Sequence, residues 1–165
     1  MIPAYANFGG KIHGGILLSL MDKVAYVCAA KHAGNYCVTA SIDSVDFLEP
    51  VEVGELLSLK ASVNYVGTSS LVVGIRVTAE NVKTQLVKHT NTSYFTMVAM
   101  DECHKPAAVP GLILETKDEI RRFAEALKRK DLKKTNQEHL KKIKSPLDMA
   151  HYRELLAGQH CHIAV

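Results

Sequence analysis

One helical stripe constrains the fold of this chain more than any other feature. From Gly14 to about His32, apolar side chains recur at three- and four-residue spacing. They are Leu17, Leu18, Met21, Val24, Ala25, Cys28 and Ala29. A helix of this length, about 19 residues at ~1.5 Å each, can cross a whole sheet, and its small alanines permit close approach to another surface. The Gly34–Asn35 pair predicts where the helix ends.

The residues that follow alternate with a period of two, which predicts β-strands. These segments cover residues 38–47, 57–65, 71–79 and, less regularly, 88–100. Within the first segment the phase slips near Asp43–Ser44, which predicts a β-bulge, and Pro50 ends the strand. Gly67–Thr68 predicts a turn. Short connections between successive strands predict antiparallel neighbours.

These elements together predict an α+β domain. An antiparallel sheet with one polar face needs a cover for its apolar face, and 14–32 is the long apolar helix that the sequence offers. We therefore expect the sheet to wrap around this helix. The predicted domain spans residues 1–115.

A basic helical C-terminal extension is predicted over residues 116–165. It begins after two prolines and contains charged helical segments at 116–130 and 131–144 and a third at 147–157. Residues 121–144 carry a net charge of +7, so the rest of the chain carries −4 of the overall +3. The basic character therefore belongs to the extension and not to the preceding domain.

Composition excludes several classes of protein. No apolar run approaches the roughly 20 residues that cross a bilayer, and the N-terminal residues resemble no secretion signal, so a cytoplasmic protein is expected. The four cysteines have no CxxC pairing, which argues against a zinc ribbon or a disulfide framework. The HCH at 160–162 is too tightly spaced for a regular metal site, so no metal is predicted.

Asp22 is an unusual residue for the apolar helix. Its neighbours at helical spacing include no cation, and Lys23 points about 100° away around the helix axis. A solvated aspartate at the edge of the stripe is the ordinary interpretation. The functional alternative is a carboxylate withdrawn from water in a cleft, where it becomes a usable base or nucleophile.

Gly14 and Gly15 stand at the start of the predicted helix. The first turn of a helix presents unpaired N–H groups and a partial positive charge, and glycine lets a ligand approach closely. Such an end can stabilise a developing oxyanion. The alternative is that the two glycines only allow tight packing of the helix start.

Several motifs, in this order and spacing, resemble the acyl-CoA thioesterases of the hotdog fold. They are N-x₅-HGG-x₆-D, VTASIDSVDFLEPVEVGE, VGTSSL, and FTMVAMDE followed by KPAAVP. The resemblance covers about residues 3–111 and is greatest to the bacterial acyl-CoA thioester hydrolases related to the mammalian cytosolic enzymes. It implies a hotdog fold, an antiparallel sheet wrapped around one long central helix.

The resemblance also implies a reaction and a set of site residues. The reaction is hydrolysis of fatty acyl-CoA to free fatty acid and CoA, with no cofactor, since coenzyme A is part of the substrate and product. The family's catalytic aspartate falls on Asp22, its asparagine on Asn7, and its helix-start glycines on Gly14 and Gly15. Asn7 of one chain would face Asp22 of another, so a homodimer is the minimal unit and a hexamer, a trimer of dimers, is usual.

Three further residues are expected to bind substrate or assist. His13 could assist catalysis, although a packing or capping histidine is the commoner role. In VGTSSL, Thr68 replaces a frequent Arg or Lys of the family, which leaves Ser69 and Ser70 as hydroxyl donors toward CoA.

Two alternative functions and the role of the basic extension stay open. A non-catalytic acyl-CoA-binding hotdog module is disfavoured by the presence of both Asn7 and Asp22, and a dehydratase would have His13 as the histidine of its acid–histidine pair. The basic extension lacks the interleaved aromatic residues of many nucleic-acid-binding segments, so no nucleic acid partner is predicted. It is expected to be solvated or to attract CoA phosphates or anionic lipid.

Overall fold

The computed structural model describes residues 1–143 together with 156, 159 and 161. The chain divides into two compact units, Met1–Leu127 and Lys128–Val165. The elements are η1 (Pro3–Tyr5), α1 (Gly14–Ala33), β1 (Tyr36–Ile42), β2 (Leu56–Val66), β3 (Ser70–Glu80), β4 (Val87–Met100) and α2 (Lys117–Ile143). The predicted third helical segment and the HCH at 160–162 fall largely outside the described residues.

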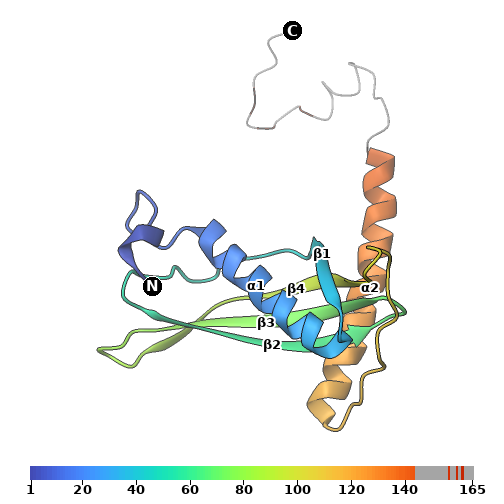
Figure 1. The fold of residues 1–165 in the computed structure, drawn as a ribbon. Coiled ribbons are helices and arrows are strands. Elements are labelled where there is room, and N and C mark those ends of the chain that lie inside the picture. Colours follow the sequence, from blue (N-terminus) through green and yellow to red (C-terminus); the bar gives the residue numbers. More distant parts are fainter. Residues whose placement is uncertain (144–155, 157–158, 160, 162–165) are drawn as a thin grey trace. The chain divides into compact units, whose positions relative to one another are not determined.

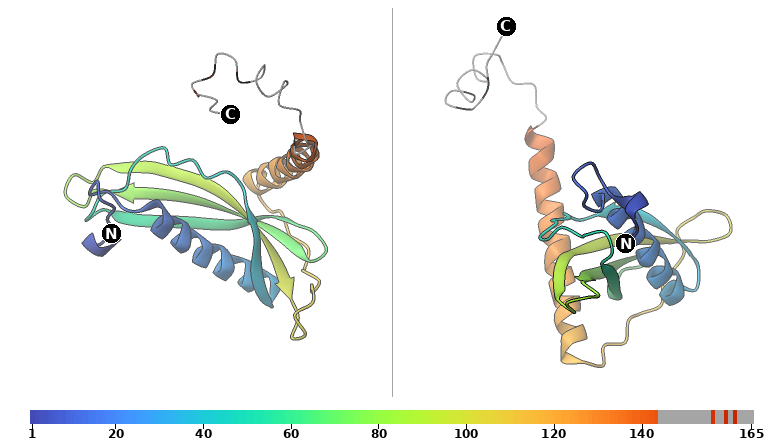
Figure 2. Two further views of the ribbon diagram at one scale, coloured as in Figure 1. Left: turned by 90° about the horizontal axis from the view of Figure 1, so that it is seen from above. Right: turned by 90° about the vertical axis from the view of Figure 1, so that its left-hand side faces the viewer.

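A four-stranded antiparallel sheet packs against one long helix, as predicted. The strand order is β1-β4-β3-β2, and α1 contacts all four strands. The helix lies along one face of the sheet, and the sheet curves around it (Figures 1 and 2). This arrangement confirms the sheet wrapped around one long helix that the alternating and helical periods predict, and it agrees with the hotdog fold that the resemblance implies.

The core depends on small residues in α1. Met21, Ala25, Ala29 and Ala33 repeat at a spacing of four, so they form one buried row along the helix. Opposite them lie the inward-facing residues of the central strands, Leu71, Val73, Ile75 and Val77 of β3 and Phe95, Met97 and Ala99 of β4. Because alanine adds little bulk, the helix backbone lies close to the sheet.

Both ends of α1 are capped by identifiable groups. At the start, Nδ1 of His13 accepts a hydrogen bond from the amide of Gly15 at 2.9 Å. At the end, Gly34 takes the left-handed conformation (φ 67°) and its amide bonds to the carbonyl of Ala30. Glycine adopts this conformation at no steric cost, which explains why the helix ends where the Gly34–Asn35 pair predicts.

The first strand differs from its prediction in two ways. The bulge lies between Thr39 and Ser41, not near Asp43–Ser44, and residues 43–47 are not in a strand. Cys37 is buried toward α1, whereas Ala40 and Ile42 are exposed, so the apolar residues that alternate in this strand do not mark its core side. The physical reason is that β1 is an edge strand, where apolar residues need not mark the core side.

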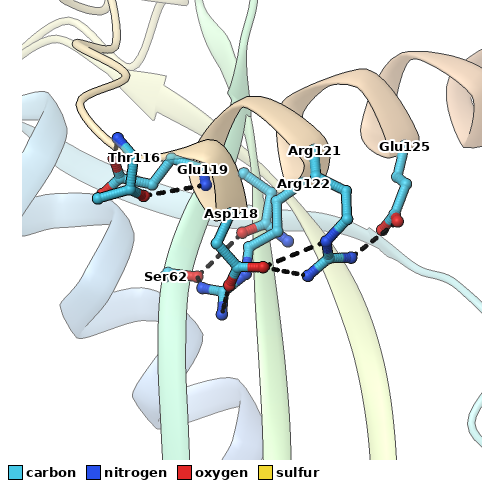
Figure 3. Close-up of polar contacts among 8 residues, drawn as sticks. Ser62, Thr116, Asp118, Glu119, Arg121, Arg122 and Glu125 are labelled. Atoms are coloured by element: carbon cyan, nitrogen blue, oxygen red, sulfur yellow. Dashed lines mark hydrogen bonds and ion pairs between the residues drawn. The ribbon is translucent and has the colours of Figure 1, made fainter.

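The charged region after Pro110 forms one helix where two segments were predicted. Residues 117–143 are continuous, because no glycine or proline interrupts them. The start of α2 is fixed by a capping box (Figure 3). The carboxylate of Glu119 accepts the amide of Thr116 at 2.9 Å, and the hydroxyl of Thr116 accepts the amide of Glu119 at 3.2 Å.

Candidate active site

Asp22 lies at a cleft between α1 and β1. The cleft has a volume of about 500 Å³ and is bordered by two short stretches. From α1 come Asp22, Lys23, Tyr26 and Val27, and from β1 come Tyr36, Cys37, Val38 and Thr39. The Asp22 side chain is half-buried here, at the edge of the apolar stripe.

One contact holds the carboxylate of Asp22. The hydroxyl of Thr39 donates a hydrogen bond to its Oδ1 at 2.6 Å, a distance typical of a hydroxyl bound to an ionised carboxylate. Lys23 borders the same cleft, but no ion pair of the described residues involves Asp22. Within the described part of the chain, the Asp22 carboxylate therefore has a hydroxyl partner and no ion pair.

Sequence reasoning missed Thr39. Val38, Ala40 and Ile42 alternate with polar residues in β1, and an apolar face normally turns toward the core, which would place Thr39 on the face away from the helix. In the structure Thr39 shares a face with buried Cys37 and pairs with Met97 of β4. The signal that could have found it is the VTASID stretch itself, where a hydroxyl residue interrupts an apolar strand beside the Asp22 helix.

Asn7 lies in a tight loop before α1. Its Oδ1 accepts the amides of Gly9 at 2.9 Å and Lys11 at 3.1 Å, so the side chain organises the loop. The side-chain nitrogen is the remaining donor of this exposed residue. No contact described within one chain joins Asn7 to Asp22 or to the residues that border its cleft.

The two glycines at the helix start are not equivalent. The amide of Gly15 already donates to His13, whereas the amide of Gly14 has no acceptor among the described residues. A Cβ on Gly14 would lie 3.3 Å from the ring of Phe47, so this ring lies directly over the helix start. Neither glycine, nor His13, borders the Asp22 cleft within one chain.

Ser69 lies in the turn between β2 and β3, and Ser70 is the first residue of β3, apart from the residues that border the cleft. Their carbonyls hold the turn and join it to β4. The carbonyl of Ser69 accepts the amide of Ala99 at 2.9 Å, and the carbonyl of Ser70 accepts the amide of Gly67 at 2.7 Å. Their hydroxyls form no hydrogen bond with other described residues, so they remain available as donors.

Neither metal ligands nor a membrane span is found in the part of the chain that the structure describes. No group of three or more His, Cys, Asp or Glu side chains there could hold a metal ion. No helix among the same residues is long and apolar enough to cross a membrane. Burial raises the pKa of the thiols of Cys28 and Cys37, which disfavours their thiolates.

Comparison with known proteins identifies relatives over most of the chain. The thioesterase superfamily model matches residues 9–85. Protein VdlD of Helicobacter pylori is 48% identical over 133 residues, which cover 81% of this chain and 76% of VdlD. YkhA of Bacillus subtilis, named an uncharacterised acyl-CoA thioester hydrolase, is 35% identical over 147 residues, covering 89% and 86%.

Solved structures agree with these relatives. An apo-hexameric acyl-CoA thioesterase has a TM-score of 0.80 and 39% identity, covering 83% of this chain and 88% of its own. An acyl-CoA hydrolase of Staphylococcus aureus, solved with butyryl coenzyme A, coenzyme A and coenzyme A disulfide, has a TM-score of 0.78 and 36% identity, covering 87% of both chains. The same enzyme was also solved as three alanine variants, at an asparagine, an aspartate and a threonine. The chain therefore belongs to the thioesterase superfamily and, within it, to the hotdog-fold acyl-CoA thioester hydrolases.

Proposed function

We propose that this protein hydrolyses fatty acyl-CoA thioesters to free fatty acid and CoA, with Asp22 as the central catalytic group. One observation carries the proposal. The Asp22 carboxylate is half-buried at a cleft, receives the hydroxyl of Thr39 at 2.6 Å and has no cationic partner among the described residues. The reaction itself is supported by the family, since its relatives are named acyl-CoA thioester hydrolases.

Asp22 acts as a general base in this mechanism. The carboxylate takes a proton from water, and the resulting hydroxide attacks the thioester carbonyl carbon. When the carbon–sulfur bond breaks, the protonated Asp22 returns the proton to the CoA thiolate. Thr39 holds one carboxylate oxygen, which leaves the other to meet the water. Direct attack by the carboxylate on the carbonyl is the less favoured variant, because the acyl anhydride would still need water for release.

Amides at the start of α1 stabilise the oxyanion. Of the two glycines, Gly14 is the better donor, because the Gly15 amide would first have to break its hydrogen bond to the His13 ring. Asn7 contributes its side-chain nitrogen to water or substrate, since its oxygen is occupied by the loop. His13, Ser69 and Ser70 remain candidates for contacts to CoA.

The spacing of these residues supports their assignment. In the Staphylococcus aureus hydrolase, the asparagine and aspartate replaced in the variants stand 15 residues apart, and the threonine follows the aspartate by 17. Asn7, Asp22 and Thr39 have the same spacing in this chain. The match adds Thr39 to the proposed site.

A homo-oligomer completes the site in this proposal. Asn7 and Asp22 have no described contact within one chain, and Phe8, beside Asn7, is fully exposed. Exposed Tyr26 and Val27 of α1 also border the Asp22 cleft. A dimer that sets the Asn7 loop of one protomer on the partner's cleft would bury these apolar groups. Hexameric thioesterases among the structural relatives support a trimer of such dimers.

The proposed location is the cytosol. A rat relative that is 32% identical over 125 residues is named a cytosolic acyl coenzyme A thioester hydrolase, although this chain spans about a third of its length. The alternative of a non-catalytic acyl-CoA-binding module needs no base, so it leaves the isolated Asp22 unexplained.

The test is release of CoA from a series of acyl-CoAs, followed with a thiol reagent. Asp22→Asn keeps the shape of the side chain but cannot accept the proton, so turnover should fall by about a hundredfold or more. Glu102→Gln, an exposed acid-to-amide change outside the cleft, is the matched control. Normal turnover by Asp22→Asn would refute the assigned base, and saturable binding without CoA release by the unmodified protein would favour the binding module.

A further inference from the structure

Two basic side chains oppose each other on the outer face of the sheet. In the β2–β3 register Lys60 pairs with Arg76, and Arg76 also pairs with Thr92 of β4. Directly opposed like charges destabilise a sheet. Lys60 and Arg76 form no ion pair or side-chain hydrogen bond with any described residue. Both side chains are exposed, so the sheet carries two adjacent positive charges on its surface without an ion-pair partner among the described residues.

A hollow of about 680 Å³ surrounds this pair. The polar side chains that line the hollow are mainly hydrogen-bond donors, and Glu125 contributes the one carboxylate of this lining. That carboxylate is already neutralised, because Arg121 donates to it at 2.7 Å (Figure 3). Arg121 and Arg122 also bind Asp118, so both arginines already have carboxylate partners. The lining cations without an ion pair are Lys60 and Arg76.

A buried amide in this hollow supplies a further donor. Asn64 is 5% exposed, and its Oδ1 accepts the hydroxyl of Ser62 at 2.9 Å. The hydrogen bond described for this side chain is made by its oxygen, so its nitrogen can donate to a ligand. A Cβ on Gly74 would lie 2.3 Å from this nitrogen, so the glycine leaves room for the amide beside the basic pair. The hollow thus combines an amide donor with two cations.

We propose that this hollow binds the phosphate group of a phosphorylated small molecule. A phosphate dianion would offset the two unopposed charges and accept hydrogen bonds from the guanidinium, the ammonium and the Asn64 amide. Lys60 and Arg76 lie on the face opposite Leu59 and Ile75, which pack toward α1. Asp22 is on the α1 side, so the phosphate site is separate from the cleft of the same protomer. We infer an effector site, independent of the proposed hydrolysis.

Binding is tested on the full chain in phosphate-free buffer by isothermal titration calorimetry. The probes are inorganic phosphate, ADP and CoA, which distinguish a bare anion site from sites for a nucleotide or for the phosphates of CoA. We expect saturable binding of at least one probe. Lys60→Ser and Arg76→Ser should each raise its Kd by about tenfold or more, the effect of losing one charged hydrogen bond. Lys83→Ser, the same loss of charge at an exposed loop residue without an ion pair, should leave the Kd unchanged.

Three results would overturn the proposal. The first is absence of saturable binding of all three probes up to about 10 mM. The second is an equal Kd in Arg76→Ser and Lys83→Ser. The third is a change of sedimentation coefficient in Arg76→Ser without any probe binding, which would make the hollow a contact between copies of the chain. None of these measurements depends on turnover, so the effector site and the hydrolase can fail separately.

Discussion

At the scale of single residues, the site depends on one short hydrogen bond. Thr39 has one hydroxyl proton, and the Asp22 carboxylate at 2.6 Å is a stronger acceptor than the Met97 sulfur at 3.4 Å. The hydroxyl therefore fixes the orientation of the proposed base without neutralising its charge. A lysine in the same place would stabilise the anion further and weaken it as a base.

Thr39→Ala should lower kcat for acyl-CoA hydrolysis by about tenfold to a hundredfold, because a hydrogen bond to a charged group contributes ~1.5–3 kcal/mol. Thr39→Ser keeps the hydroxyl and should recover most of the activity. Steady-state kinetics of the two variants distinguish a positioning hydroxyl from a packing methyl group. Equal loss in both variants would contradict the positioning role.

Gly74 permits a second residue-scale prediction. Alanine here places a methyl group against the Asn64 amide and 3.1 Å from the Tyr94 ring, so Gly74→Ala should cost about 1–3 kcal/mol and lower the Tm. Gly111→Ala is the matched control, since nothing lies within 4 Å of its Cβ. Thermal unfolding followed by circular dichroism compares the two, and equal Tm values would show that Asn64 moves away freely.

At the scale of elements, the start of α1 depends on the side chain of His13, which binds an amide of the first helical turn. The ring accepts a hydrogen bond from the Gly15 amide at 2.9 Å, and the Gly14 amide is the oxyanion donor in the proposed mechanism. In that proposal, stability and chemistry use neighbouring amides of one helix turn.

His13→Ala should lower the free energy of unfolding by about 1 kcal/mol, because it removes the side-chain cap of α1. His13→Asn supplies another acceptor and should restore it. Urea denaturation of the two variants measures the difference. If the His13→Ala and His13→Asn variants have the same free energy of unfolding, the side-chain cap contributes nothing to stability and His13 is free for another role.

The start of α2 should respond to acid. Hydrogen bonds from Thr116 and Glu115 amides lower the pKa of Glu119, and hydrogen bonding and charge from Arg121 lower the pKa of Asp118. A carboxyl whose pKa is lower in the folded state stabilises the fold above its ordinary pKa, and this contribution is lost as the pH falls through the lowered value. Amide exchange at 115–122 should therefore accelerate between about pH 4 and pH 2 relative to the β3 amides. Glu119→Gln removes one of these two carboxylates, so the acceleration of amide exchange at 115–122 in acid should be smaller in this variant.

At the scale of the whole molecule, the proposed site needs two chains. A mixture of inactive Asn7→Ala and inactive Asp22→Asn protomers should regain activity, because a mixed dimer pairs an intact Asn7 with an intact Asp22 at one of its two sites. With random pairing, about a quarter of the wild-type activity is expected. Co-expression followed by the CoA-release assay tests this, and a mixture no more active than its components would contradict a shared site.

The sequence by itself determined the architecture, because in α1 and in the central strands the period of the apolar residues matches the buried face. The repeat of Met21, Ala25 and Ala29 and the alternation of β3 identify the two surfaces that pack together. Asp22 was found for the same reason, as a charge among apolar residues. Its exposed counterpart Asn7 was assigned only through the resemblance of a motif, since no periodic pattern marks a loop residue.

Only the tertiary structure decided which groups meet. Thr39 reaches Asp22 because an edge strand turns its less apolar face toward the helix, and the bulge at Ala40 follows it. Lys60 and Arg76, 16 residues apart in the sequence, become neighbours through the β2–β3 register. Local patterns fix burial and element type, whereas strand register and hydrogen bonding between distant side chains depend on the packing of the folded chain.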